Sequence, residues 1–195
     1  MLIAISAVLV FVSFPIFPAA AFLEYDAADV PVLLAAFTMG PGAGMAVLTL
    51  ASAIQAFLFG KNGVIGFFMH MMASGALVLV SGVIYRRFAK KPGALVGGLI
   101  AGSLLMVLLM IPLNFIFTPK LMMDVPIAES AAIFASRFLG LGGGEFSEAC
   151  VNAYELVRGM LLVAIVPFNL VKAGLNSVLF ALCFKRMRQL LAEKN

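Results

Sequence analysis

Five polar side chains lie inside otherwise apolar stretches of the sequence, where each could bind a ligand or a neighbouring helix. They are Gln55, His70, Asn114, Asn169 and Lys172. A polar group at membrane depth is costly unless it faces a partner, a cavity or a ligand. An amide both donates and accepts hydrogen bonds, and a lysine adds a charged donor. Counted at about 1.5 Å of helix rise per residue, all five fall in the same half of the membrane. This pattern predicts a pocket that opens to one side of the membrane and is closed towards the other.

Each of these side chains also has a structural explanation that needs no ligand. Lys172 could extend to the membrane surface, or it could pair with Asp29 or Glu155. The two asparagines could bond to neighbouring helices, Gln55 could join two helices, and His70 could be a packed core histidine. The sequence alone leaves these alternatives open.

The sequence carries no recognisable catalytic constellation. The HExxH motif of membrane metalloproteases is absent, and the apolar runs hold neither an aspartate pair nor a serine with a clear histidine partner. His70 is the only histidine, and no acid of the predicted spans accompanies it, so a metal site is not expected. We therefore predict that the protein is not an enzyme and carries neither a metal nor a cofactor.

Long uncharged runs must supply the elements that hold these residues. Of the 195 residues, 64% are hydrophobic and only 11% are charged, whereas soluble domains carry about 25% charged residues. A helix of about 20 apolar residues crosses a hydrocarbon core of about 30 Å. The sequence GPGAG at 40–44 divides one long run, because proline and glycine interrupt helices. We predict an all-α membrane protein, a single-domain bundle of six transmembrane helices over about 2–22, 30–39, 43–59, 63–85, 93–118 and 159–184.

Basic residues predict the orientation of this bundle. Two clusters of four, within 86–91 and 185–194, follow the fourth and sixth predicted spans. Such charges gather on the cytoplasmic side, so both termini are predicted to be cytoplasmic in the plasma membrane, and no nucleic-acid partner is expected. The acidic segment 24–29 then faces outside. The region 119–158 is predicted to be a long external loop with one short surface helix near 126–138.

Three motifs resemble the substrate-binding S components of energy-coupling factor (ECF) vitamin transporters. The stretch YDAADVPVLLAAFTMGPGAG, at 25–44, resembles their first external loop and second helix. IVPFNLVK, at 165–172, is similar to the P-F-N-x-x-K segment of the riboflavin-specific members. PLNF, at 112–115, resembles their L-N-Y/F at the outer end of helix five. The resemblance covers nearly the whole chain except 120–158.

The resemblance implies a riboflavin binder without catalytic activity, with riboflavin as the transported ligand. It also implies a transmembrane coupling subunit and two ATPase subunits as partners, in the lipid bilayer. Matching positions imply that Asn114, Asn169 and Lys172 hold the flavin ring and that the loop around Asp29 covers the pocket. Gln55 and His70 are further candidates from their depth alone.

Two other hypotheses stay open at this point. The same fold could bind another vitamin or a nucleobase-like precursor. Alternatively, the chain could be a structural membrane subunit without a small ligand, in which Asn114, Asn169 and Lys172 bond only to protein neighbours.

Overall fold

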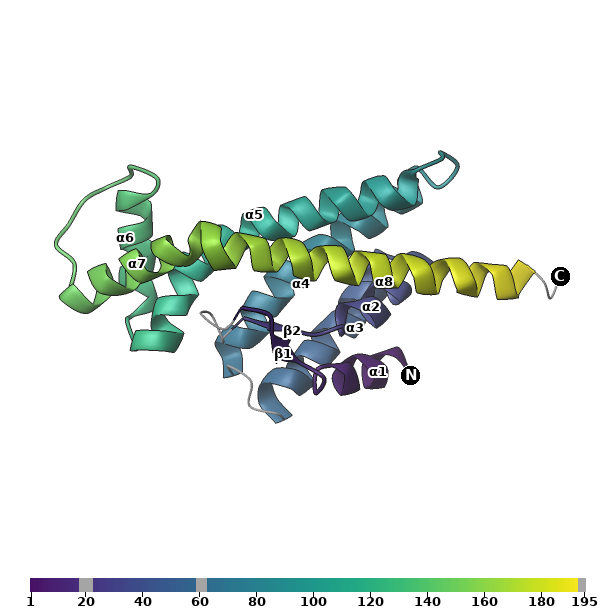
Figure 1. Cartoon of the computed structure of the whole chain (residues 1–195), viewed down its shortest axis with the longest axis horizontal. Coiled ribbons are helices and arrows are strands. Elements are labelled where there is room, and N and C mark those ends of the chain that lie inside the picture. Colours follow the sequence, from purple (N-terminus) through teal and green to yellow (C-terminus); the bar gives the residue numbers. More distant parts are fainter. Residues whose placement is uncertain (18–22, 59–62, 193–195) are drawn as a thin grey trace.

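Helices form almost all of the structure, as the apolar runs predict (Figure 1). The computed structural model describes residues 1–17, 23–58 and 63–192, the side chains of 190–192 excepted. The helices are α1 (Leu2–Leu9), α2 (Asp29–Thr38), α3 (Pro41–Ala53), α4 (Gly63–Arg87), α5 (Ala94–Met123), α6 (Ile127–Arg137), α7 (Glu148–Met160) and α8 (Val166–Ala192). Two π-helical segments, Ile54–Leu58 and Leu161–Ile165, continue α3 and join α7 to α8, and the strands are β1 (Phe14–Pro15) and β2 (Glu24–Tyr25).

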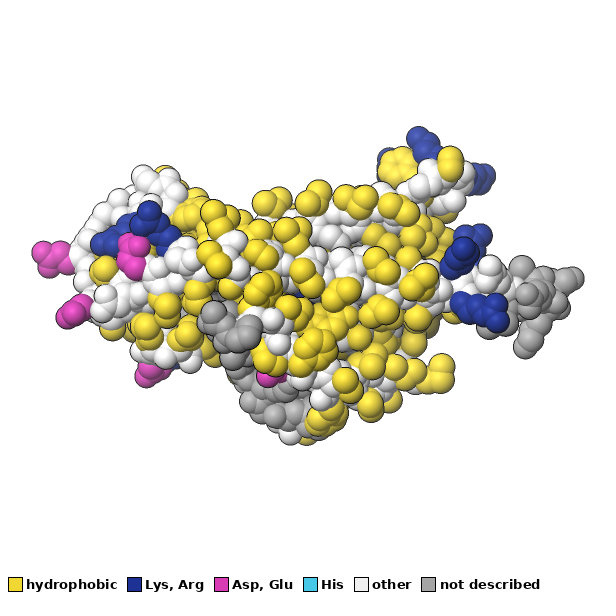
Figure 2. Space-filling model, viewed as in Figure 1, with side chains coloured by type: hydrophobic (Ala, Val, Ile, Leu, Met, Phe, Trp, Pro, Cys, Tyr) yellow, Lys and Arg dark blue, Asp and Glu magenta, His cyan; other side chains and the backbone are white. Residues whose placement is uncertain are grey.

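The prediction of a helical membrane protein is confirmed. Within the described residues, four helical stretches are long and apolar enough to cross a membrane: Pro41–Leu58, Gly63–Arg87, Ala94–Met123 and Glu148–Gln189. The α2 helix is apolar as well but only 10 residues long, and α1 has 8 residues. Hydrophobic side chains cover the middle of the molecule, with lysines, arginines and acids gathered towards its ends (Figure 2). The count of six spans and the cytoplasmic termini stay predictions.

The first predicted span, 2–22, is wrong as a continuous helix. The α1 helix ends at Leu9, and β1 pairs antiparallel with β2, Phe14 opposite Tyr25. The extended backbone of Phe14 and Pro15 in this pairing is incompatible with a helix that continues to residue 22. Residues 18–22 of this predicted span lie outside the described residues.

The predicted break in the long run 30–60 is confirmed between α2 and α3. Gly40 has a φ of 115°, a backbone conformation that suits glycine. A Cβ at this position would lie 2.6 Å from Arg86 Nη1. Pro41 then occupies the first turn of α3, where its missing amide hydrogen costs nothing. The chain therefore turns back on itself within two residues.

The region predicted as an external loop, 119–158, is largely helical. The predicted short helix is present as α6, but α5 runs on to Met123, and α7 continues through the π segment into α8. The Ser147 hydroxyl accepts the backbone N–H of Cys150 at 3.3 Å and so caps α7. A search for uncharged runs misses this helix because its other face is charged. Its buried residues recur at helical spacing: Cys150, Ala153, Tyr154 and Val157.

Close packing of α4 on α5 depends on two glycines. A Cβ at Gly98 would lie 2.8 Å from the carbonyl oxygen of Ser81, and one at Gly102 would lie 2.6 Å from that of Leu77. Small residues at such crossings let membrane helices approach until their backbones touch. This contact fixes α5 relative to α4, and both helices carry residues of the site described below.

Substituting Gly102 tests this contact. We expect Gly102→Ala to destabilise the protein by about 1–3 kcal/mol, because the backbone of α4 must move to admit the new methyl group. The control is Gly97→Ala on the same helix, where a Cβ meets nothing within 4 Å. Thermal unfolding of the two purified variants in detergent provides the measurement. Equal melting temperatures would contradict the close packing.

Candidate functional site

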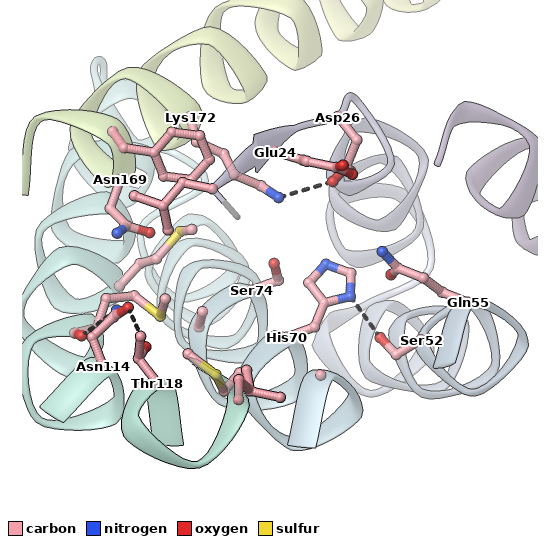
Figure 3. A pocket seen from close by; sticks show the side chains of 18 of the residues that line it. Glu24, Asp26, Ser52, Gln55, His70, Ser74, Asn114, Thr118, Asn169 and Lys172 are labelled. Carbon is pink, nitrogen blue, oxygen red and sulfur yellow. Dashed lines mark hydrogen bonds and ion pairs between the residues drawn. The ribbon is translucent and has the colours of Figure 1, made fainter. Parts of the chain in front are cut away.

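A cavity of about 350 Å³ lies between α3, α4, α5 and α8 (Figure 3). It is lined by the end of α3 with its π segment, the first half of α4, the second half of α5 and the beginning of α8. All of these parts lie away from the basic turn between α4 and α5. Small-molecule sites usually have volumes of about 300–1,000 Å³. The cavity is thus of a size for a small organic ligand, and the half of the membrane in which it lies stays a prediction.

Helical periodicity brings the lining residues together. On α5, Met106, Met110, Asn114 and Thr118 follow one another at intervals of four, so they share one face. On α4, Gly66, His70 and Ser74 have the same spacing, and on α8 Asn169 and Lys172 are separated by three. Both π-helical segments adjoin the cavity, since Gln55 lies in the first and Phe168 follows the second.

Five of the six side chains singled out in the sequence line this cavity: Gln55, His70, Asn114, Asn169 and Lys172. Figure 3 shows Asn114, Thr118 and Asn169 on one side and His70, Ser52 and Gln55 on the other. Lys172 reaches between them towards Asp26. Their contact with a ligand stays a prediction, but their convergence on one space is a property of the fold.

The two asparagines bond within their own helices, which argues against a role in joining helices. Asn169 Nδ2 donates to the carbonyl oxygen of Ile165 at 2.8 Å. Asn114 Nδ2 donates to the carbonyl oxygen of Met110 at 2.8 Å, and its Oδ1 accepts the Thr118 hydroxyl at 3.0 Å. A carboxamide has two N–H donors and two acceptor lone pairs. Each side chain is therefore oriented by its helix and keeps hydrogen-bonding capacity for the cavity.

Lys172 forms a buried ion pair with Asp26. Its Nζ lies 2.9 Å from Asp26 Oδ2, and the two side chains are 11% and 6% exposed. Asp26 Oδ1 also accepts the backbone N–H of Ala28 at 3.0 Å, which holds the carboxylate in place. Asp29 and Glu155 are the partners expected from the sequence, and neither is bonded to Lys172. Asp26 is not among the predicted partners, although it belongs to the acidic segment 24–29 that is predicted to face outside.

A cover formed by the loop around Asp29 stays a prediction: Glu24 and Asp26 of this loop line the cavity, whereas Asp29 itself lies behind its wall. It is the first residue of α2 and is fully buried. Its Oδ1 lies 3.3 Å from His70 Nε2, and its Oδ2 accepts from Asn176 Nδ2 at 3.2 Å. The expectation that no acid lies beside His70 is wrong. That expectation counted only acids within the predicted spans, whereas α2 begins one residue earlier, at Asp29.

Asn176 connects the segment before α2 to α8. Besides Asp29, its Nδ2 donates to the carbonyl oxygen of Asp26 at 3.3 Å, and its Oδ1 accepts the Tyr25 hydroxyl at 3.0 Å. Burial raises the pKa of the Tyr25 phenol, with the Asp26 charge adding to the effect, so this hydroxyl stays a donor. Residues 169, 172 and 176 share one face of α8. The same face of α8 thus lines the cavity through Asn169 and Lys172 and binds the segment before α2 through Asn176.

Ser52, His70 and Asp29 form a chain of contacts with the connectivity of a catalytic triad. Ser52 Oγ lies 2.9 Å from His70 Nδ1, and His70 Nε2 faces Asp29. Acyl transfer also needs backbone N–H groups aimed at the developing oxyanion. Ser52 lies inside α3, where the backbone N–H groups are bonded along the helix. The contacts therefore orient the His70 ring at the cavity wall.

Asp26→Asn tests the importance of the buried ion pair. Breaking a buried pair leaves an uncompensated charge, so we expect the ligand-free protein to lose about 3–5 kcal/mol of stability. Asp124→Asn is the matched control, because Asp124 pairs with Lys120 with its own side chain 87% exposed. This control should change stability little, since solvent screens exposed pairs. Denaturant unfolding in detergent compares the two variants. Similar losses of stability in the two variants would show that the buried pair of Asp26 with Lys172 contributes no more than an exposed pair.

Comparison with known families gives one match across almost the whole chain. The model of the family described as "ECF transporter, substrate-specific component" matches residues 1–184. A solved structure of the S component of a bacterial ECF transporter superposes with a TM-score of 0.70 at 26% identity, covering 98% of this chain and 93% of that one.

Individual relatives carry the names of riboflavin transporters. RibU of Staphylococcus aureus is 29% identical over 98% of this chain and 88% of its own length. RibU of Streptococcus thermophilus is 29% identical over 97% of this chain and 81% of its own. FmnP of Bacillus subtilis is 26% identical over 96% and 88%, respectively.

Proposed function

This chain belongs to the family of substrate-specific components of ECF transporters, and from that premise we propose that it binds riboflavin within the membrane for uptake. The relatives named as riboflavin transporters match almost its full length. The observation that carries the proposal is the cavity itself, on which Asn114, Asn169 and Lys172 converge between apolar walls. The proposed role is capture and release of the vitamin, without chemical change.

The lining of the cavity suits a flat, largely apolar ring with one polar edge. The isoalloxazine ring of riboflavin has a uracil-like edge on which acceptors alternate with a donor. The Asn169 amide offers both functions, and Lys172 supplies a charge-assisted donor that is stronger away from water. Three methionines, Met69, Met106 and Met110, and Phe168 line the rest. Thioether sulfur makes favourable contacts with aromatic rings.

Asp26 makes the Lys172 ammonium compatible with a neutral ligand. An unpaired ammonium at this depth would be strongly disfavoured, and a neutral vitamin cannot neutralise it. While Asp26 holds one of its three N–H donors, the remaining donors of Lys172 can turn towards a ring carbonyl or nitrogen. In the proposed complex, Asp26 therefore keeps the lysine charged and directed at the cavity.

The chain is a multi-pass protein of the plasma membrane, and we propose six crossings with both termini in the cytoplasm. The exposed basic residues of the α4–α5 turn and of the α8 C-terminal end support this orientation. The cavity then opens towards the outside. The proposed partners are a transmembrane coupling subunit and two ATPase subunits, as implied by the family. They would supply the energy that a binding protein alone lacks.

Riboflavin binding by the purified protein tests this function. We expect saturable quenching of riboflavin fluorescence, and we expect Lys172→Ala to weaken binding by about 10- to 100-fold, since a hydrogen bond from a charged donor contributes about 1.5–3 kcal/mol. The control is Lys120→Ala, which removes a lysine outside the cavity lining and should leave the affinity unchanged. An unchanged affinity in Lys172→Ala would remove this residue from the site.

Binding assays with a panel of other vitamins and nucleobases test the identity of the ligand independently of the family assignment. Saturable binding of another compound with none of riboflavin would contradict the proposed substrate and leave the family assignment intact. Absence of binding to any of them would favour the structural-subunit hypothesis.

A further inference from the structure

A second hollow lies between α5 and α8, apart from the proposed riboflavin cavity. It has a volume of about 420 Å³, and its walls are aliphatic side chains and small residues. Ser103 and Ser177 line it as well, and their hydroxyl oxygens lie 3.4 Å apart across the two helices. On α5 it extends from Leu95 to Leu104, and on α8 from Leu170 to Ala181. We call this hollow the α5–α8 groove. It shares no lining residue with the riboflavin cavity.

Exposed basic residues follow the lining residues of the α5–α8 groove at one of its ends. On α8 its lining residues Leu170, Gly174, Val178 and Ala181 recur every three or four positions. The same stripe continues at Lys185 and Arg188, four and seven positions after Ala181. Lys91 lies in the turn before α5, four positions before Leu95, with its ammonium 5.1 Å from the centroid of the Phe88 ring. Figure 2 shows lysines and arginines where α8 and the α4–α5 turn leave the apolar body of the molecule.

These basic side chains lack acidic partners in the part of the chain that the structure describes. Lys91, Lys185 and Arg188 are exposed, and none of the ion pairs found among the described residues includes them. They lie at one end of the apolar α5–α8 groove, which extends from them towards the middle of the membrane. The charge at its end thus favours an occupant with an apolar chain and an anionic head.

A phospholipid has this composition. Basic pockets between membrane helices on the cytoplasmic side bind anionic head groups, and an acyl chain gains from filling apolar surface that would otherwise pack poorly. A second copy of the chain suits the groove less well. A twofold axis along the membrane normal would place the same basic residues of both copies against each other.

We propose that the α5–α8 groove binds one anionic phospholipid of the leaflet on the C-terminal side. Its acyl chain lies along Leu99, Ser103 and Gly174, and its phosphate contacts Lys185, Arg188 and Lys91. The site is separate from riboflavin binding, so either proposal can fail without the other.

Native mass spectrometry of the delipidated protein tests this site. The probes are phosphatidylglycerol and phosphatidylcholine with identical acyl chains, added in turn to the detergent-solubilised full chain. We expect one phosphatidylglycerol to bind about 30- to 150-fold more tightly than phosphatidylcholine, as expected for two or three basic contacts. The Lys185→Gln/Arg188→Gln double variant should lose that preference, whereas Lys120→Gln, at the other end of α5, should keep it.

A groove-filling substitution tests the acyl-chain contact separately. Gly174 lines the groove and a Cβ there would meet nothing within 4 Å, so Gly174→Leu adds an apolar side chain at the groove wall. We expect it to weaken binding of both lipids. Gly97→Leu is the matched control, since Gly97 is also unobstructed and exposed but does not line the groove.

Riboflavin binding at wild-type affinity in every variant shows that the bundle is folded. If riboflavin is not the ligand, an unchanged melting temperature in detergent serves instead. Equal binding of the two lipids to the wild type, or a preference that survives the double charge variant, would overturn the proposal. So would binding of inorganic phosphate as tight as that of phosphatidylglycerol, because the acyl chain would then contribute nothing.

Discussion

The ammonium of Lys172 has to be neutralised inside the membrane, and much of the structure around the cavity follows from that constraint. Moving a charge out of water costs several kcal/mol, and an opposite charge offsets this only at close range and with its other hydrogen bonds satisfied. Asp26 meets both conditions, 2.9 Å from the ammonium and bonded to the backbone of Ala28. The position of a single carboxylate therefore determines where the N-terminal segment must run.

The remaining contacts of that segment maintain this position. The short β1–β2 pairing brings Tyr25 towards α8, where Asn176 accepts its hydroxyl and donates to Asp29. Asp29 in turn contacts His70, so the network reaches α4. Buried polar networks stabilise a structure only when their members are satisfied, and here each of these partners is bonded. Protein groups thus neutralise the charges at this wall, while the amides of Asn114 and Asn169 on the facing side retain capacity for a ligand.

Local patterns predicted four membrane-spanning stretches of the described residues, the turn at Gly40 and five of the residues that line the cavity. Each of these depends on one stretch of sequence: an apolar run, a Gly-Pro pair, or a count of residues along a helix. The failures have different physical causes. The first helix ends at Leu9, and the pairing of Phe14 with Tyr25 that follows depends on a residue outside that run. The search for uncharged runs missed α7 because one face of this helix is charged, although its other face is buried and packs at one end of the bundle. Whether Asp26 or Asp29 pairs with Lys172 depends on where the chain bends before α2, and no local sequence pattern determines that bend.

The distance in sequence between the partners of the central ion pair also sets an order of events during biosynthesis. Asp26 and Lys172 are 146 residues apart, and Tyr25 and Asn176 are 151 apart. At about 5–20 residues per second, on the order of ten seconds pass between synthesis of the aspartate and of its lysine. Until then the carboxylates of Asp26 and Asp29 lack their partners on α8, and the N-terminal segment has only its contacts with earlier elements, such as that of Asp29 with His70. The binding site is consequently one of the last parts of the molecule to form, and a chain truncated before its final helix cannot contain it.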